Sequence, residues 1–289
     1  MVVMTHSVRT RSVRSLLTGM AMLLVAAALF SGCVGDKDVA DTRIISVSGS
    51  TTNLPIAQAV AELYMDIHQT DEILVSGGGS GVGIRAVGEG TADIGMSSRD
   101  IRQTEIEQYP DLVEHVIAYD GIGVIVNPEN PVSSLTLDQI KAIYKGEITN
   151  WREIDGNDRQ IVVVGRDSAS GTREFFYEEV MNKEEFVRTQ QELNSNGAIR
   201  RTIQQTPDAI GYVGLGYVDD TVRGINIWID DRSVAPTVSN VADGTYPIAR
   251  SLYMYTRGEA SGLVKDYLHF LLSDDGQAIV AREGFVPIR

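Results

Sequence analysis

From residue 43 onward, short apolar segments alternate with segments that have the spacing of an amphipathic helix. Residues 43–48, "RIISVS", predict a strand, and residues 54–68 place Ile56, Val60 and Tyr64 on one face of a helix. The pair recurs where the strand-like "QIVVVG" of residues 160–165 precedes the helical "TREFFYEEVM" of residues 172–181. This alternation predicts an α/β fold with mainly parallel strands.

Other segments extend the same pattern. Residues 136–146, "TLDQIKAIYKG", predict a helix that begins at a capping box of Thr136 and Gln139 and ends at Gly146. A helix is also expected to begin near residue 81, and another to cover residues 263–272. Further strands are predicted at residues 72–77, 92–97, 121–127, 209–215, 224–229 and 251–256.

Four strand-like segments run into turns rich in glycine, serine and threonine. Three of these turns open a predicted helix, and the fourth follows the strand at residues 92–97. Ligands of open α/β sheets gather at the carboxyl ends of strands, so the turns are expected to meet at one site. They are "SGSTTNLP" (48–55), "SGGGSGVG" (76–83), "GMSSRD" (95–100) and "DSASGTRE" (167–174).

The last of these turns has the chemistry of an anion site. Arg166 and Arg173 flank the first turn of a helix, where cations are unfavourable by about 0.3–1 kcal/mol each. An external anion would resolve that conflict, because helix N–H groups, hydroxyls and a two-pronged arginine suit a small tetrahedral oxyanion. Taken singly, Ser170 and Thr51 are more simply helix N-caps, and Arg99 and Arg173 could pair with surface acids. Four such turns with three arginines favour the anion site.

The first 32 residues have the pattern of a secretory signal peptide. Three arginines precede an apolar stretch at residues 16–30, which is shorter than the roughly 20 residues of a spanning helix. "FSGC" then ends at Cys33, as in the lipobox of lipoproteins, so Cys33 is the predicted lipidation site and residues 33–42 a tether. The alternative is an uncleaved membrane anchor. Cys33 is the only cysteine, which excludes an internal disulfide.

Composition excludes several functions. The formal charge is −14, and it becomes −17 without residues 1–32, which hold three arginines and no acid. Nucleic-acid binding needs clustered positive charge, so no nucleic-acid partner is expected. The chain contains no G-x-S-x-G, S-x-x-K or H-E-x-x-H motif, so we expect no enzyme, no metal and no cofactor. A Ser–His pair assembled in space remains an alternative.

Several long motifs make the chain resemble the phosphate-binding proteins of phosphate-specific ABC importers. The likeness covers about residues 43–289. It rests on "SGSTT", "GGGSG", "ADIGMSSR", "LTLDQIKAIYKGEITNW", "GRDSASGTR", "TPDAIGYVGLGYV", "YPIARSLYMYT" and "DDGQAIVAREGFVPI".

The resemblance implies a two-lobe periplasmic-binding-protein-like fold of type II, with two crossing strands as a hinge and the anion in the cleft. The first lobe would comprise residues 43–124 and 249–289, and the second lobe residues 125–248. The crossings are expected near residues 121–126 and 246–252. The phosphate-binding residues it implies are Ser50, Thr51, Thr52, Ser80, Ser98, Arg166, Ser170, Gly171 and Thr172, with Asn196 and Gly197 as weaker candidates.

The chain departs from the family pattern at two positions. Well-known members carry an aspartate in place of Ser98, and it accepts the proton of bound phosphate and so excludes sulfate. Some carry another aspartate in place of Ser168. Arg99 is expected to add positive charge near Ser98.

The resemblance implies an exported, lipid-anchored monomer on the outer face of the cell membrane. It would capture inorganic phosphate for an ABC permease, which a cytoplasmic ATPase drives. The alternatives are a binding protein for sulfate, molybdate or tungstate, and a secreted phosphate-ester hydrolase or phosphate sensor.

Overall fold

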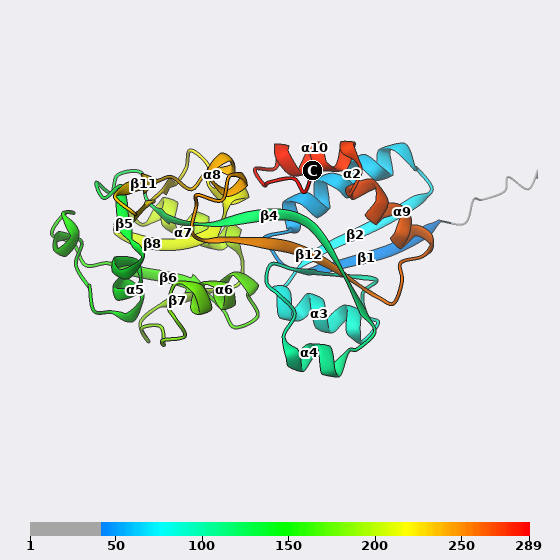
Figure 1. Cartoon of the computed structure of the whole chain (residues 1–289), viewed down its shortest axis with the longest axis horizontal. Coiled ribbons are helices and arrows are strands. Elements are labelled where there is room, and N and C mark those ends of the chain that lie inside the picture. Colours follow the sequence, from blue (N-terminus) through cyan, green and yellow to red (C-terminus); the bar gives the residue numbers. More distant parts are fainter. Residues whose placement is uncertain (1–41) are drawn as a thin grey trace, which may run out of the picture. The chain divides into compact units, whose positions relative to one another are not determined.

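Two long strands, β4 (Leu112–Val126) and β12 (Ala249–Arg257), join the two lobes of the protein (Figure 1). The computed structural model describes residues 42–289. The predicted signal peptide, Cys33 and the tether up to residue 41 lie outside this part. The two strands pair antiparallel, from Ala249 opposite Gly121 to Arg257 opposite Leu112. They are central in one sheet with the strand order β2-β1-β3-β12-β4-β8-β6-β7, and β9 pairs with β4.

The first lobe surrounds the amino-terminal strands. Helices α2, α9 and α10 lie along one face of β1 and β2, and α3 packs against β1 and β3 (Figure 1). The strands are β1 (Arg43–Gly49), β2 (Asp71–Gly77) and β3 (Ile94–Ser97). The helices are α2 (Leu54–Ile67), α3 (Ser80–Gly88), α4 (Gln103–Gln108), α9 (Gly262–Leu271) and α10 (Asp274–Arg282).

The second lobe continues the sheet through β8 and β6 and adds a small three-stranded sheet. The strands are β5 (Ser134–Thr136), β6 (Val162–Arg166), β7 (Gln191–Leu193), β8 (Ala209–Gly214), β9 (Arg223–Gly224), β10 (Asn226–Ile229) and β11 (Arg232–Val234). The helices are α5 (Leu137–Lys145), η1 (Trp151–Ile154), α6 (Gly171–Glu179), α7 (Asn196–Gln205), η2 (Leu215–Tyr217) and α8 (Val238–Ala242).

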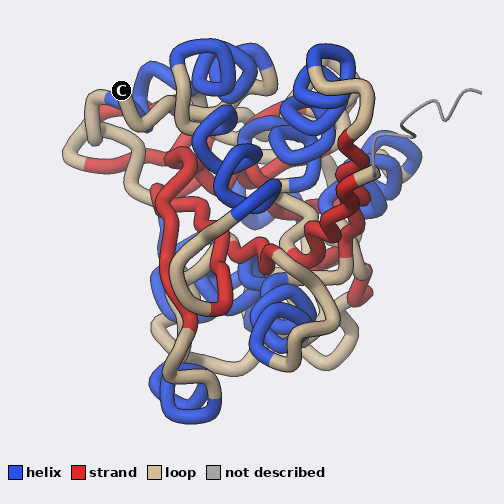
Figure 2. Tube along the Cα trace, turned by 90° about the vertical axis from the view of Figure 1, so that its right-hand side faces the viewer, coloured by secondary structure: helices blue, strands red, loops and turns tan. Residues whose placement is uncertain are grey.

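Each lobe has an apolar core of its own. One core draws on residues between 45 and 118 and between 252 and 285, including Val47, Ile56 and Tyr267. The largest core of the second lobe is built around Trp151, Tyr212 and other residues between 122 and 248. In the view of Figure 2 the strands run between helices that lie mainly on the outside. The predicted lobe boundaries at residues 124 and 249 stay a prediction.

Most of the predicted elements are present, and the helix at residues 137–145 forms as its capping box predicts. Gln139 N donates to Thr136 Oγ1 at 3.1 Å, and Thr136 N donates to Gln139 Oε1 at 2.9 Å. Gly146 ends this helix with a φ of 76°, a conformation that favours glycine. The strands of each lobe are parallel, as predicted, in the pairs β1–β2, β1–β3, β6–β8 and β6–β7. The crossing strands depart from this pattern, because β12 and β4 run antiparallel to their neighbours.

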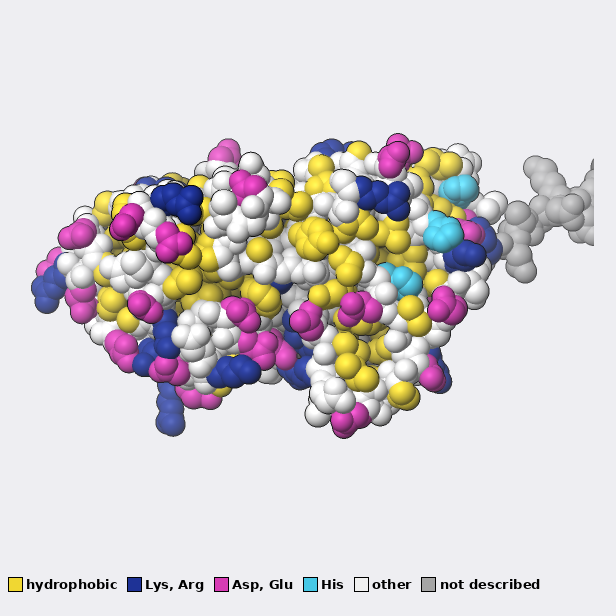
Figure 3. Space-filling model, viewed as in Figure 1, with side chains coloured by type: hydrophobic (Ala, Val, Ile, Leu, Met, Phe, Trp, Pro, Cys, Tyr) yellow, Lys and Arg dark blue, Asp and Glu magenta, His cyan; other side chains and the backbone are white. Residues whose placement is uncertain are grey.

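Basic and acidic side chains are interspersed over both lobes on the face shown in Figure 3. The surface in this view therefore carries no extended basic patch. Within residues 42–289, none of the helices combines the length and the apolar character that crossing a bilayer requires.

Candidate anion-binding site

The four glycine-, serine- and threonine-rich turns meet where the two lobes touch. Thr52 Oγ1 of the first lobe lies 3.1 Å from Thr172 Oγ1 of the second. Gly81 N donates to Ala169 O at 3.2 Å across the same junction. All of the predicted site residues are buried, and apart from Gly171 each is at most 6% exposed. They are Ser50, Thr51, Thr52, Ser80, Ser98, Arg166, Ser170, Gly171 and Thr172. The structure thus brings all of them to one junction.

Glycine permits this close approach at two positions. Gly49, at the end of β1, has a φ of 136°, which side chains rarely adopt, and a Cβ there would lie 2.3 Å from Met96 O. A Cβ on Gly171 would lie 2.2 Å from Ser80 Oγ of the opposite lobe. Glycine at position 49 therefore lets the turn after β1 pack against the backbone at Met96, and glycine at position 171 lets the amino terminus of α6 approach the side chain of Ser80 across the lobes.

Arg166 ends β6 and is 1% exposed. Its Nε donates to Leu193 O, and its Nη2 donates to Asn194 O and to Thr51 Oγ1, each at 3.2 Å. Within residues 42–289 its guanidinium pairs with no carboxylate, and its buried Nη1 has no hydrogen-bond partner. Burial lowers the pKa of Arg166 to about 10, because desolvation penalises the charged form. A buried, unpaired cation of this kind needs an anion.

The hydroxyl of Thr51 is arranged to donate. Its Oγ1 accepts from Arg166 Nη2 at 3.2 Å, from Asn196 Nδ2 at 3.1 Å and from Asn196 N at 3.4 Å. A hydroxyl oxygen has two lone pairs and one hydrogen, so these donors occupy its acceptor capacity. The hydrogen of Thr51 is then directed toward another acceptor, such as an anion. Tyr217 fixes the turn by donating to Thr51 O at 2.6 Å.

Helix α6 presents its amino terminus to the same place. Ser170 is its N-cap, with Oγ accepting from Arg173 N at 3.2 Å, so the simpler interpretation of this residue is confirmed. Thr51 is no cap, because α2 begins after Asn53. The N–H groups of Gly171 and Thr172 lie in the first turn of α6 and have no intrahelical acceptor. Both can donate to an anion beside Arg166.

Ser98 lies against Ser80 at the base of the site. Ser98 N donates to Ser80 Oγ at 3.0 Å, and the two side-chain oxygens are 3.4 Å apart. Asp100, the next carboxylate along the chain, accepts from Tyr253 OH at 2.5 Å, and Asp167 accepts from Ala169 N. The position of the family's proton-accepting aspartate therefore holds a hydroxyl here.

Two of the arginines that the sequence singled out are committed elsewhere. Arg99 pairs with Glu105 at 2.7 Å and, across the lobes, with Glu174 at 2.6 Å, so its expected contribution of positive charge beside Ser98 is wrong. The carboxylates attract the guanidinium more strongly than the uncharged serines do. Arg173 lies over the ring of Phe186, 4.8 Å from its centroid, and pairs with Glu192 at 3.8 Å.

Sequence reasoning missed two charged residues of the site. Arg250 on β12 and Asp120 on β4 are buried, and Arg250 Nη2 donates to Asp120 Oδ2 at 2.8 Å and to Thr172 Oγ1 at 3.0 Å. Arg250 lies inside the motif "YPIARSLYMYT". This motif contributes to the family resemblance, but the sequence alone assigned no role to its arginine. Asn196, a weaker candidate, contacts both Thr51 and Thr52.

The junction is a cage of donors around one uncompensated positive charge. Asp120 balances Arg250, and Arg166 has no such partner among residues 42–289. Hydroxyls and free helix N–H groups complete the cage. This arrangement is suited to a small oxyanion, bound between the lobes so that both must close on it.

Comparisons with known proteins agree with this geometry. The family model of the PBP superfamily domain matches residues 36–275. Phosphate-binding protein PstS of Bacillus subtilis (strain 168) is 35% identical over 278 residues, which cover 93% of this chain and 91% of PstS. PstS of Borreliella burgdorferi is 31% identical, with 93% of this chain and 97% of that protein covered.

Solved structures lead to the same group. A protein from Clostridium perfringens, named as a phosphate ABC transporter substrate-binding protein and crystallised with bound phosphate, superposes with a TM-score of 0.81 and 39% identity, covering 86% of this chain and all of the other. An ABC-type phosphate transport receptor from Vibrio cholerae has a TM-score of 0.67 and 33% identity, with 84% and 99% covered. The two-lobe fold expected from the sequence is confirmed.

Proposed function

We propose, from the premise that this chain belongs to the PstS family of phosphate-binding proteins, that it captures inorganic phosphate between its lobes and delivers it to an ABC importer. The PstS relatives are named as binding proteins, and the proposed role is likewise capture without chemistry.

The observation that carries this proposal is Arg166. A guanidinium that is 1% exposed, with an unpartnered Nη1 and no carboxylate partner within residues 42–289, is unfavourable until an anion joins it. Thr51 and the first turn of α6 supply further donors at the same place. A tetrahedral oxyanion matches the fork of the arginine and the spread of the hydroxyls.

The proposed ligand set has two jaws. The first lobe contributes Ser50, Thr51, Thr52, Ser80 and Ser98, and the second lobe Arg166, Ser170, Gly171 and Thr172. Asn196 orients Thr51 and Thr52 from α7. Phosphate would then hold the lobes together, and its release would require them to part.

Titration calorimetry with phosphate, sulfate and molybdate tests this function on purified protein from which bound anions have been removed. We expect one phosphate per chain. Absence of phosphate binding would contradict the proposal, and tighter binding of molybdate would assign the site to a different oxyanion. Turnover of a phosphate ester by the same sample would favour the hydrolase alternative.

A second candidate, sulfate as an additional ligand, rests on Ser98. Within residues 42–289, the Ser98 position offers the anion a hydroxyl contacting Ser80 rather than a carboxylate that would repel sulfate. A serine can rotate to donate, so it penalises a fully ionised anion less.

Location and assembly complete the proposal. The protein would be exported, attached through lipidated Cys33 to the outer face of the cell membrane, and would act as a monomer with a permease in that membrane.

Cys33→Ser should release it into the soluble fraction without changing phosphate affinity, because the lipid acts only through the tether. Retention on membranes after a high-salt wash would show that the apolar segment at residues 16–30 is the anchor.

A further inference from the structure

The crossing strands place a second arginine beside the anion site. Asp120 of β4 and Arg250 of β12 lie directly opposite each other in the antiparallel pair. Arg250 donates to Asp120 Oδ2 from Nη2 at 2.8 Å and from Nε at 3.1 Å. Asp120 is fully buried and Arg250 is 6% exposed. Leu215 N fixes the carboxylate by donating to its Oδ1 at 2.9 Å.

The same guanidinium touches one threonine from each lobe. Arg250 Nη2 donates to Thr52 Oγ1 at 3.3 Å and to Thr172 Oγ1 at 3.0 Å, and Nη1 donates to Ser98 O at 2.8 Å. Arginine has no acceptor, so both threonine oxygens must accept at this contact, and their hydrogens point away from it. The Oγ1 atoms of Thr52 and Thr172 lie 3.1 Å apart. The hydroxyl hydrogen of one threonine therefore bridges the two oxygens, and the hydroxyl hydrogen of the other remains for a ligand.

We infer, on the basis of the proposed function, that Arg250 and Asp120 form a positioning pair that orients the hydroxyls of Thr52 and Thr172, so that one hydrogen bridges the two oxygens and the other is directed at bound phosphate. Asp120 holds the guanidinium in place and cancels its charge, which leaves Arg166 as the uncompensated cation among the site residues described. The pair lies on the strands that link the lobes. It therefore aligns the two hydroxyls, one from each jaw, only when the jaws close on each other.

Replacing both partners together tests the pair without leaving a buried, unpaired charge. Asp120→Asn keeps an acceptor for Leu215 N, and Arg250→Met keeps most of the side-chain length. The matched control is Asp71→Asn with Arg43→Met, which removes an ion pair of 2.6 Å where β1 and β2 begin, at the strand ends opposite the site. Melting temperatures confirm that both double variants fold.

Calorimetry should show that the Asp120/Arg250 variant binds phosphate about tenfold to a hundredfold more weakly than the parent, and that the control binds as the parent does. If the parent binds phosphate and the Asp120/Arg250 double variant binds it with the same affinity, this inference alone is overturned. No binding by the parent would overturn the proposed function, and this inference with it.

A second comparison separates positioning from direct contact. The Asp120/Arg250 replacement is repeated in a protein that carries Thr52→Val and Thr172→Val. If the pair acts through the two hydroxyls, it loses its effect on phosphate affinity once they are absent. An equal loss in both backgrounds would overturn the positioning role.

Discussion

Replacing Arg166 by methionine should abolish tight phosphate binding and leave the ligand-free protein nearly as stable as before. The cation is 1% exposed, and its Nη1 has no partner within residues 42–289. Two charge-assisted hydrogen bonds to phosphate, at about 1.5–3 kcal/mol each, correspond to about a 10²- to 10⁴-fold loss of affinity.

The stability of the ligand-free protein has two opposing terms. Burial lowers the pKa of Arg166 to about 10, which corresponds to a cost of about 3 kcal/mol for keeping the cation there, and methionine removes that cost. Methionine also leaves Leu193 O and Asn194 O without their donor, at about 1–3 kcal/mol each. The gain of about 3 kcal/mol offsets much of the combined loss of about 2–6 kcal/mol, so chemical denaturation without phosphate should give a free energy of unfolding within about 3 kcal/mol of the parent's.

Arg173→Met is the matched control, since Arg173 lies in helix α6, seven residues after Arg166, and contacts Phe186 and Glu192 instead of the site. Calorimetry should find near-parental affinity for Arg173→Met and almost none for Arg166→Met. Equal affinities in the two variants would remove Arg166 from the site. A large loss of stability in phosphate-free Arg166→Met would refute the argument that the arginine awaits an anion.

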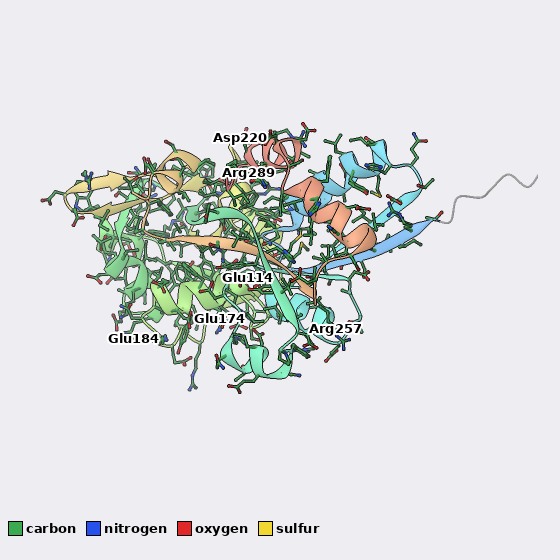
Figure 4. All side chains as sticks on the ribbon, turned by 45° about the vertical axis from the view of Figure 1, so that its right-hand side comes forward. Glu114, Glu174, Glu184, Asp220, Arg257 and Arg289 are labelled. Atoms are coloured by element: carbon green, nitrogen blue, oxygen red, sulfur yellow. The ribbon has the colours of Figure 1, made fainter. Side chains whose placement is uncertain are left out.

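Three further outcomes follow from the contacts of the site. Sulfate in excess should displace phosphate from the parent but not from Ser98→Asp, because a carboxylate repels an anion without a proton; failure of sulfate to compete with the parent would contradict this. Thr51→Val should weaken phosphate binding by about 1–3 kcal/mol and reduce the compaction seen by small-angle scattering, so full compaction would argue against a two-jaw site. Glu174, which is labelled in Figure 4, pairs across the lobes with Arg99 at 2.6 Å and with Arg102 at 2.5 Å, and these ion pairs should slow phosphate release. Glu174→Gln is expected to release phosphate up to about fivefold faster in stopped-flow at low salt, and an unchanged rate would show that the ion pairs do not hold the lobes.

Local patterns were sufficient to find most of the site. The turns around Thr51, Ser80, Ser98 and Ser170 follow strands directly, and glycine and hydroxyl residues at strand ends are visible in a short window of sequence. Their meeting at one place follows from the rule that strand ends of an α/β sheet share an edge. Arg166 stood out because it conflicts with the helix that follows it.

The Asp120–Arg250 pair could not be found in this way. Its members are 130 positions apart and lie within strands, where a charged residue has no distinctive local pattern. Only the antiparallel register of β4 and β12 brings them opposite each other. The error about Arg99 has a similar cause in part, because one of its two partners, Glu174, belongs to the other lobe, whereas the other, Glu105, is only six residues away in the sequence.

The most direct test of the account is a crystal structure of the protein with phosphate. The account predicts one phosphate between the lobes, with an oxygen about 3 Å from Arg166 Nη1 and others on Thr51 Oγ1 and the N–H groups of Gly171 and Thr172. Phosphate bound elsewhere, or bound in the junction with Arg166 Nη1 still unpaired, would contradict it.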